Sequence, residues 1–598
     1  MSKMYKACVL ALVLLCNVAA AQRTLTGTVI SSEDKQPIVG ATVLIEGTTT
    51  GTVTDLNGKF SLDVDSTAKN LVFSFVGMKK QVVPIGAAND LNVTMEIDRS
   101  TFDEVVVTAL AVKREKRELG FGTTTIKGED LSKASQNSAL NSLQGKVAGA
   151  QITNATGAPG GSTRVVLRGG SSFTGDNNAL IVVDGVPVNN GNYGVGNDLN
   201  GQSDVLNNQF DVGNRGNDIN PQDIENITVL KGAAATALYG QQGANGVIMI
   251  TTKKGSLVPT DKPGKKFMVS FNTQTSFSRP LKLPERQTVY GQGGLKAPDY
   301  RENFNWGPKL DGTLNPWGQE VEGEARVKPY SALPNSLNKF FATGKTYNNN
   351  LAISGANKGT NYYLSYNNFK YEGIVPGTGY MRNSLRTNIT HDFGDKLSSL
   401  VTFNYNRTDG DLVSQGQGDQ APLYNLLQIP IDIPIAELKD LTNKFNTPAG
   451  YFGAYALNPY WVLANNKTSN LVDRFNTNIT LNYKPAKWLT FTGRFGSDNY
   501  TDSRFQKWRK ITYTNWDTEK KLVGRYSEDI YRVGQYNADL IVQGMRTFKE
   551  KYMISVLVGG NMFVNNTKNT YAQTAGLSVD DLYTFSNSQD RPTLTNIV

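Results

Sequence analysis

The chain has 598 residues and a formal net charge of +9. This charge is spread along the chain, and the densest charged run, Lys113–Glu118, is mixed in sign, so a nucleic-acid surface is not expected. Glycine (58), tyrosine (26) and phenylalanine (25) are abundant, whereas charged residues make up only 19% of the chain. This usage is typical of a protein with many strands and turns and an aromatic rim.

The start of the chain has the layout of a secretory signal peptide. A basic end and an apolar run over 7–15 precede the small residues Ala19–Ala21, which form a cleavage site. A lipoprotein signal acylated at Cys16 is the alternative, and the bulky Leu15 before it argues against this. Cys8 and Cys16 are the two cysteines, so the mature, exported chain is expected to have no disulfide. No later apolar stretch is long enough for a transmembrane helix, which leaves a soluble or a β-barrel fold.

Residues 22–98 read as short strands separated by turns, which fits a small β-sandwich. Asp55–Gly58 supplies turn chemistry between two of these strands. The segment from Gly27 to Leu62 resembles the carboxypeptidase regulatory-like domain, whose name implies no peptidase activity. The predicted strands are Thr24–Ile30, Ala41–Ile45, Lys59–Val64, Leu71–Phe75 and Leu91–Glu96.

A lone β-prone run lies in the linker region, 99–116, which follows this domain. The run could be one more strand of an ordinary sheet. Its isolation also suits a free strand that pairs with the sheet edge of a partner through main-chain hydrogen bonds. In sequence and position it resembles the TonB box of TonB-dependent importers, and the residues expected to contact TonB are Asp103, Glu104, Val105, Val106, Val107, Thr108 and Ala109.

Residues 117–258 form a glycine-rich α/β segment. Ser138 is expected to cap a helix, Asn220–Pro221 reads as a helix start, and Gly240 after Ala233–Tyr239 reads as a helix stop. The predicted strands are Val165–Leu167, Leu180–Val183, Ile227–Leu230 and Val247–Thr252.

Four stretches of this segment, 143–153, 157–170, 180–190 and 219–255, resemble the plug domain of SusC/RagA importers, in the order of that family. The charged residues of these motifs are expected to hold the plug inside a polar lumen, because buried charges must be paired. The glycines are expected to adopt positive φ or to allow tight packing. These plug residues are Arg164, Arg168, Gly169, Gly170, Asp184, Gly185, Lys231, Gly232 and Gly240.

From Phe267 onward the hydrophobic period becomes two. Runs of about ten residues with one apolar and one polar face are typical of a transmembrane barrel. Tyr483–Trp488 reads as a short periplasmic turn flanked by aromatics, and 408–470 as an extracellular loop. A soluble sandwich is the alternative, but its exposed faces would carry more charge than these Asn, Thr and Ser faces. The predicted strands are Phe267–Ser278, Asn361–Tyr371, Arg382–Phe393, Leu397–Arg407, Asp473–Tyr483, Trp488–Asp498 and Lys551–Asn561, with a weaker one at Tyr536–Gln543.

Reactive groups for an enzyme are missing from the sequence. His391 is the single histidine, and the two cysteines lie in the expected signal peptide. The sequence therefore lacks most of the residues that Ser-His or Cys-His catalysis and multi-histidine zinc sites require. Residues 157–164 superficially resemble a phosphate-binding loop, but Arg164 stands where Gly-Lys-Ser/Thr is required. A pair of catalytic carboxylates stays open, although nothing singles one out. We therefore predict no catalysis, no cofactor and no metal.

The resemblance implies a mostly β protein of the outer membrane of a Gram-negative, Bacteroidetes-like bacterium. Its expected parts are a signal peptide (1–21), a β-sandwich (22–98), the TonB box and linker (99–116), an α/β plug (117–258) and part of a large antiparallel barrel (259–598). The implied function is TonB-dependent import of oligosaccharides or oligopeptides with a SusD-like surface lipoprotein, in contact with outer-membrane lipid and not with nucleic acid. A structural or adhesive surface barrel is the alternative, although it would need neither box nor plug.

The barrel region is short for this family. Large plugged transporters use about 22 strands, each of about ten residues plus turns and loops. Residues 267–598 cannot supply so many strands, so the sequence predicts a truncated chain whose barrel does not close.

Overall fold

The structure, a computed structural model, forms two compact units, one of residues 1–106 with 113–120 and one of residues 107–112 with 121–598. The expected signal peptide lies outside the described residues, as do Asp103, Glu104, Thr108 and Ala109 of the expected TonB box. The residues that the structure describes are 23–32, 35–48, 50–65, 68–75, 78–86, 88–96, 105–107, 113–115, 122–132, 138–170, 172–173, 177–191, 207–232, 239–255, 267–357, 359–548 and 552–597.

The first unit is a sandwich of two small sheets, as expected. Buried and exposed side chains alternate along its strands, so each sheet turns one apolar face inward. Phe60 and Phe73 meet edge to face across the core, with ring centroids 5.5 Å apart. One sheet has the order β4 (Lys59–Val64), β1 (Arg23–Ser31), β7 (Val93–Met95), and the other has the order β3 (Gly51–Val53), β2 (Thr42–Ile45), β5 (Asn70–Ser74), β6 (Gln81–Pro84).

The middle of the expected TonB box is a short strand. β8 (Val105–Val107) pairs with β9 (Lys113–Glu115) in a two-stranded sheet. This local pairing occupies one edge of the three-residue strand, so a partner strand would add to its other edge or displace β9. Contact with TonB stays a prediction.

The plug is built on a five-stranded sheet. Its hydrophobic core is a cluster of buried aliphatic side chains such as Leu140, Ile181, Ile227 and Ile248. A separate hairpin of β11 (Ala150–Asn154) and β12 (Thr163–Leu167) joins this core. The five strands lie in the order β10 (Thr123–Lys127), β16 (Ile224–Leu230), β17 (Val247–Thr252), β13 (Leu180–Val183), β14 (Val186–Val188).

Helices are fewer in the described plug than the sequence predicts. The hydroxyl of Ser138 accepts from the amide of Leu140, but only a 3-10 turn, Asn141–Leu143, follows. Asn220 also acts as a cap, accepting from the amide of Gln222, and again only a 3-10 turn results, because the chain enters β16 at once. Capping chemistry was thus read correctly, while the length of the helices was wrong. Besides these turns the plug has the short helix α2 (Gly128–Ser132), whereas 233–238 lies outside the described residues.

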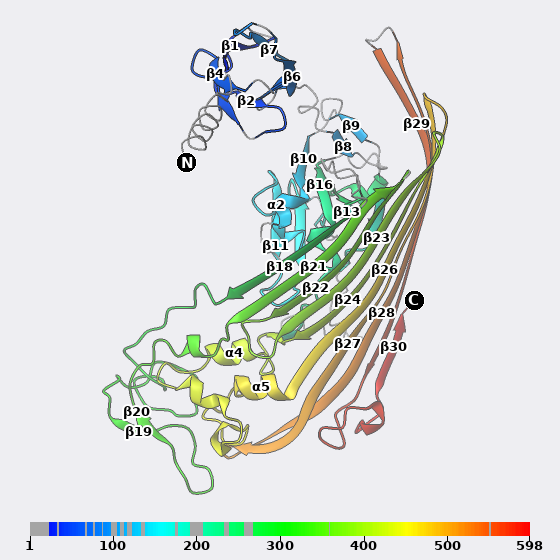
Figure 1. The fold of residues 1–598 in the computed structure, drawn as a ribbon. Coiled ribbons are helices and arrows are strands. Elements are labelled where there is room, and N and C mark those ends of the chain that lie inside the picture. The colour runs from blue at the N-terminus through cyan, green and yellow to red at the C-terminus, as the bar shows by residue number, and fades with distance from the viewer. Residues whose placement is uncertain are drawn as a thin grey trace, which may run out of the picture. The chain divides into compact units, whose positions relative to one another are not determined.

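Ten antiparallel strands form a curved wall around the plug (Figure 1). Neighbours in the wall are consecutive, and its two edge strands, β18 and β30, are not paired with each other, so the described sheet is open. The expected transmembrane-type fold is confirmed. The strands are β18 (Phe267–Ser278), β21 (Gly344–Asn357), β22 (Thr360–Glu372), β23 (Gly379–Phe393), β24 (Leu397–Leu412), β26 (Asn466–Ala486), β27 (Leu489–Asn515), β28 (Thr518–Phe548), β29 (Tyr552–Gln573) and β30 (Thr593–Ile597).

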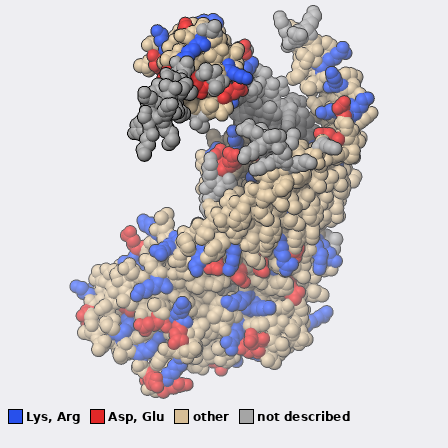
Figure 2. All heavy atoms as spheres, in the orientation of Figure 1, with Lys and Arg blue, Asp and Glu red and all other residues tan. Residues whose placement is uncertain are grey.

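The two faces of the wall differ in chemistry. On β26, Arg474 and Asn478 are buried toward the plug, whereas Phe475 and Ile479 point outward and are exposed. Strands β22, β23, β24 and β27 alternate in the same way, and Figure 2 shows a band across the strands where charged side chains are rare. An apolar outer face with a polar inner face is what a lipid-embedded sheet requires. His391 lies on the outer face, where its Nδ1 is 2.7 Å from the Thr360 hydroxyl.

Long connections at one end of the wall fold together into a loop region. The segments between β18 and β21 and between β24 and β26 share a hydrophobic core that includes Trp317, Phe340, Ile433 and Tyr451. The expected polar loop over 408–470 is therefore partly a packed structure. Its elements are β19 (Leu314–Pro316), β20 (Val327–Pro329), β25 (Gln415–Gly416), α4 (Pro422–Leu427) and α5 (Pro459–Asn465).

A half-buried arginine and a buried lysine stabilise this loop region. The guanidinium of Arg326 lies between the rings of Trp317 and Phe445, at 3.6 and 4.7 Å from their centroids. Burial lowers the pKa of Arg326 to about 10. Lys328 and Asp432 form an ion pair at 2.5 Å, both with less than a tenth of the side chain exposed.

Candidate functional site

Buried polar and charged side chains gather where the plug meets the wall, and this contact region is called the seam below. One part of it is the two-residue turn Asp184–Gly185, which joins β13 to β14. Both residues have positive φ, as a type I′ hairpin turn requires, and Asp-Gly is a preferred pair for that turn. The carboxylate of Asp184 accepts from the amide and the hydroxyl of Thr252, at 3.0 and 2.6 Å, which ties the turn to β17.

This turn is held by three strands of the wall. Asn478 donates to the carbonyl of Asp184 at 3.1 Å, and Arg494 donates to the carbonyl of Gly185 at 3.0 Å. The guanidinium of Arg386 lies 3.9 Å from the carboxylate of Asp184. A Cβ on Gly185 would lie 2.7 Å from Arg494, so only glycine allows this approach. These contacts support the prediction that Asp184 holds the plug, and that role stays a prediction.

Arg474 is the most heavily bonded side chain of the seam. It lies on β26, is 2% exposed, and makes five hydrogen bonds. Two go to Asp498 on β27, at 2.8 and 2.7 Å, and one goes to Asp218 of the plug at 2.9 Å. The other two go to the plug carbonyls of Arg215 and Asn189. Arg474 therefore joins the wall to two separate plug segments.

A third contact is centred on Asp223 in the plug. Its carboxylate accepts from Tyr363 at 2.9 Å and from Ser365 at 2.6 Å, both on β22. Arg386 lies 3.7 Å away, so one wall guanidinium faces both Asp223 and Asp184. Because these carboxylates are about 2% exposed, their separation from the wall cations would leave charges buried without partners.

The other charged residues of the plug motifs are not brought to this seam. Arg164 and Arg168 are exposed. Lys231 donates to the Thr124 hydroxyl of the plug itself at 2.9 Å, and burial, with a smaller contribution from Arg168, lowers the pKa of Lys231. Of the motif glycines, Gly169, Gly185, Gly232 and Gly240 have positive φ, and Gly170 packs against Asn177.

Sequence reasoning missed the wall side of the seam. Arg382, Arg386, Arg474 and Arg494 were read as members of barrel strands without a role. Their signal was nevertheless present, because each occupies the inward phase of an alternating strand, where a cation needs an anion. Arg382, for example, donates to the plug carbonyl of Asn217 at 2.5 Å.

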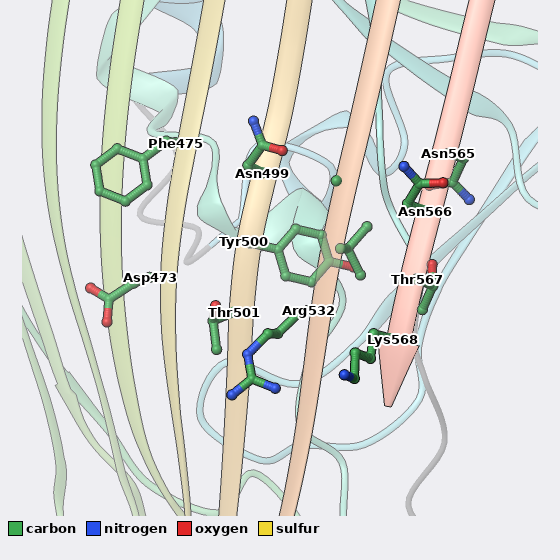
Figure 3. Close-up of a pocket in the computed structure, with 12 residues that line it drawn as sticks. Asp473, Phe475, Asn499, Tyr500, Thr501, Arg532, Asn565, Asn566, Thr567 and Lys568 are labelled. Carbon is green, nitrogen blue, oxygen red and sulfur yellow. The ribbon is translucent and has the colours of Figure 1, made fainter. Parts of the chain in front are cut away.

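A hollow of about 510 Å³ lies on the wall, away from the seam (Figure 3). Its centre is formed by the cross-strand neighbours Phe475, Asn499, Gly534 and Asn566, where the missing side chain of Gly534 leaves space. Phe475 is outward-facing, in alternation with Arg474, so the hollow opens away from the plug.

Two further features were sought among the described residues: a cluster of metal ligands and a membrane-spanning helix. Among these residues, no cluster of His, Cys, Asp and Glu has three or more members placed to hold a metal ion. No helix in this part of the chain has the length and the apolar character needed to cross a membrane.

Comparison with family models identifies two domains. Residues 25–107 match the CarboxypepD_reg-like domain, and residues 115–247 match the TonB-dependent Receptor Plug Domain. These matches lie in the order expected from the sequence, although the exact domain boundaries stay predictions.

Known proteins resemble the chain over most of its length. TonB-dependent receptor P26 of Formosa agariphila is 28% identical over 593 residues, which cover 98% of this chain and 53% of that protein. TonB-dependent receptor SusC of Bacteroides thetaiotaomicron is 33% identical over 390 residues, which cover 65% of this chain and 34% of SusC. The chain thus spans about half the length, or less, of these relatives. They are receptors and not enzymes, in agreement with the expected lack of catalysis.

Solved structures share the fold. The RagAB peptide importer in its open-open state gives a TM-score of 0.62 at 20% identity, over 83% of this chain and 53% of the other. Its closed-closed state gives 0.60 at 21% identity, over 80% and 52%. With a regulatory-like domain, a plug seated against an antiparallel wall, and these relatives, the chain belongs to the SusC/RagA family of TonB-dependent receptors of the outer membrane.

Proposed function

We propose that the chain takes part in TonB-dependent import of oligomeric nutrients across the outer membrane. The observation that carries this proposal is the seam, in which wall arginines such as Arg474 hold plug carboxylates such as Asp218. A lumen wide enough for oligomers would leak without a plug, and a plug held by discrete ion pairs can be released as a body. An adhesive or structural barrel has no need for such a releasable contact.

Energy for release would come from TonB. In this proposal TonB pairs with the segment Asp103–Ala109 by strand addition and pulls on the plug. Removing one partner of a buried ion pair costs about 3–5 kcal/mol. In this proposal the pull by TonB supplies the work needed to separate a few such pairs.

The finer features of the transport cycle belong to the same proposal. Cargo bound on the outer side would expose the TonB segment on the inner side, so the two sites would be coupled. Oligosaccharides or oligopeptides are the cargo classes, and a SusD-like surface lipoprotein is the partner that would cover the loop region. Support comes from the relatives, one of which is named SusC and another a peptide importer.

Deletion of Asp103–Ala109 at the chromosomal locus tests the proposal. Growth on the cognate nutrient should be lost, while the amount of protein in the outer membrane should stay normal, because the segment follows the last sandwich strand, β7, and precedes the first strand of the plug sheet, β10. Surface abundance is measured alongside growth as the control. Normal growth of the deletion strain would refute energised import and favour a structural or adhesive role.

A further inference from the structure

A cavity of about 250 Å³ lies between the plug and the wall, separate from the ion pairs of the seam. Its wall side includes Tyr371 on β22 and Tyr380 on β23, which flank the connection 373–378. The opposite end of β23 leads to the tight turn 394–396, between β23 and β24. Tight turns mark the periplasmic end of such barrels, so the cavity lies on the outer side of the plug, where cargo arrives.

The wall side of the cavity is one row of cross-strand neighbours. Ser276 is paired with Thr346, Thr346 with Tyr371, and Tyr371 with Tyr380. All four line the cavity, so the row presents two hydroxyls and then two tyrosines on four successive strands. Side chains that are direct partners lie close enough to contact one small ligand together.

The floor of the cavity is the plug loop Thr156–Gly161. The amide of Asn217 donates to the carbonyls of Gly160 and Gly161, both at 2.8 Å, which fixes this loop. Gly160 has φ of +71°, and a Cβ there would lie 2.4 Å from the ring of Tyr380. The loop and the tyrosine row are therefore in contact and form a preshaped pocket.

Its lining carries hydrogen-bonding groups but no charge. None of the lining residues is Asp, Glu, Lys, Arg or His; they are serine, threonine, asparagine, glycine, alanine and tyrosine. Within the described chain, Asn217 Oδ1 and Ser278 Oγ are buried and have no hydrogen-bond partner, although both residues line the cavity and Asn217 is only 5% exposed. A buried acceptor without a partner is costly, which favours a ligand that donates to it.

These properties select among the classes of cargo. Hydroxyl groups of a neutral sugar both donate and accept, as the side chains of this lining do, and the tyrosine rings offer an apolar face to the ring of a sugar. A peptide terminus or a uronate would bring a charge into a pocket without a counter-ion, which is unfavourable. The volume is slightly below the usual range of about 300–1,000 Å³ for small-molecule sites, so a single terminal unit of an oligomer fits.

We infer that this cavity binds a terminal unit of a neutral oligosaccharide and that neutral oligosaccharides are the cargo of this importer. The inference rests on the proposed function, since it names the substrate of the same transport path. Tyr371 would contact the sugar ring, and Ser278 and Asn217 would bond to its hydroxyls.

Binding to the full-length protein purified from the outer membrane tests the inference. Calorimetric titrations would use cello-, xylo- and mannooligosaccharides as neutral probes, oligogalacturonate as an acidic probe and a tryptic digest of casein as a peptide probe. We expect binding of at least one neutral probe and a loss of about tenfold in affinity in Tyr371→Ala, equivalent to about 1.4 kcal/mol. Tyr366→Ala is the matched control, because Tyr366 lies on the same strand but is 48% exposed on the outer face.

Two further variants guard against a folding defect. Tyr371→Phe keeps the ring, and Ser278→Ala removes one unpartnered hydroxyl, with the outward Thr275→Ala on β18 as its control. Binding of the acidic or peptide probe alone, or neutral binding that all inward variants leave unchanged, would overturn the inference. Import that is abolished by deletion of Asp103–Ala109 but unaffected by Tyr371→Ala would overturn the cavity assignment while leaving the proposed function intact.

Discussion

Among substitutions in the seam, we expect Arg474→Ala to weaken the contact between plug and wall the most. The guanidinium joins Asp218 of the plug and Asp498 of the wall, and these carboxylates are 2% and 1% exposed. Removal of one partner from a buried ion pair costs about 3–5 kcal/mol, because the remaining charge stays buried. If this cost falls on the seated plug, the population with a displaced plug rises by between about a hundredfold and a few thousandfold.

A leak through the lumen is the observable consequence of a displaced plug. Cells that carry Arg474→Ala should become sensitive to vancomycin, which is too large for ordinary porins, and the purified protein should conduct ions in planar bilayers more often than wild type. Arg407→Ala is the matched control, since Arg407 pairs with Asp473 at 3.7 Å on the outer face, with side chains 53% and 35% exposed. Such an exposed pair is worth about 0–1 kcal/mol. Equal sensitivity and equal conductance in the two variants would refute the reasoning.

Three further predictions concern the other parts of the chain. Residues 22–98 should fold alone with dispersed amide resonances, because their core is complete, and a collapsed spectrum would contradict this. Lys328→Met should speed proteolysis of the loop region by leaving Asp432 buried without its cation, whereas the exposed Lys370→Met should not. Burial and nearby Asp432 raise the pKa of Tyr330 to about 12, above the ordinary value of 10.0. The folded state therefore keeps this proton longer, and the stability from Tyr330 is present below pH 10 and lost between pH 10 and about 12, which Tyr330→Phe should flatten in alkaline unfolding curves.

The sequence predicted the strands that are short apolar runs or that alternate polar with apolar residues, and it failed where neither pattern is visible. Leu180–Val183 and Val247–Thr252 were predicted with the observed bounds. The wall strand β21 was missed because Asn348, Asn349 and Asn350 put polar residues on both faces, which hides the period of two. Long strands were cut short for a related reason: β27 and β28 continue past the apolar band into the loop region, where both faces are polar.

The plug side of the candidate site could be predicted from the sequence, whereas the wall side could not. Asp184–Gly185 was found because an Asp-Gly pair between two apolar runs is a strong local turn signal. Its partners Arg386 and Arg494 lie more than 200 residues later in the chain, and no local pattern links a strand arginine to a distant carboxylate. Which of several inward arginines meets which aspartate is decided by the register of the wall around the plug.

A reversible lock on the seam tests most directly whether the plug must leave the wall for import to occur. A Cβ on Gly496 of β27 would lie 3.1 Å from the Cβ of Val186 on β14, a few tenths of an ångström below the Cβ–Cβ range of about 3.5–4.5 Å for a disulfide, so a small backbone shift is enough to bridge the two positions. The variant Val186→Cys/Gly496→Cys should lose import when oxidised and regain it after addition of a reductant, because the two native cysteines, Cys8 and Cys16, lie in the expected signal peptide. Each single variant, treated in the same way, should import throughout. Full import by the oxidised double variant, with the disulfide verified by mass spectrometry, would contradict the account.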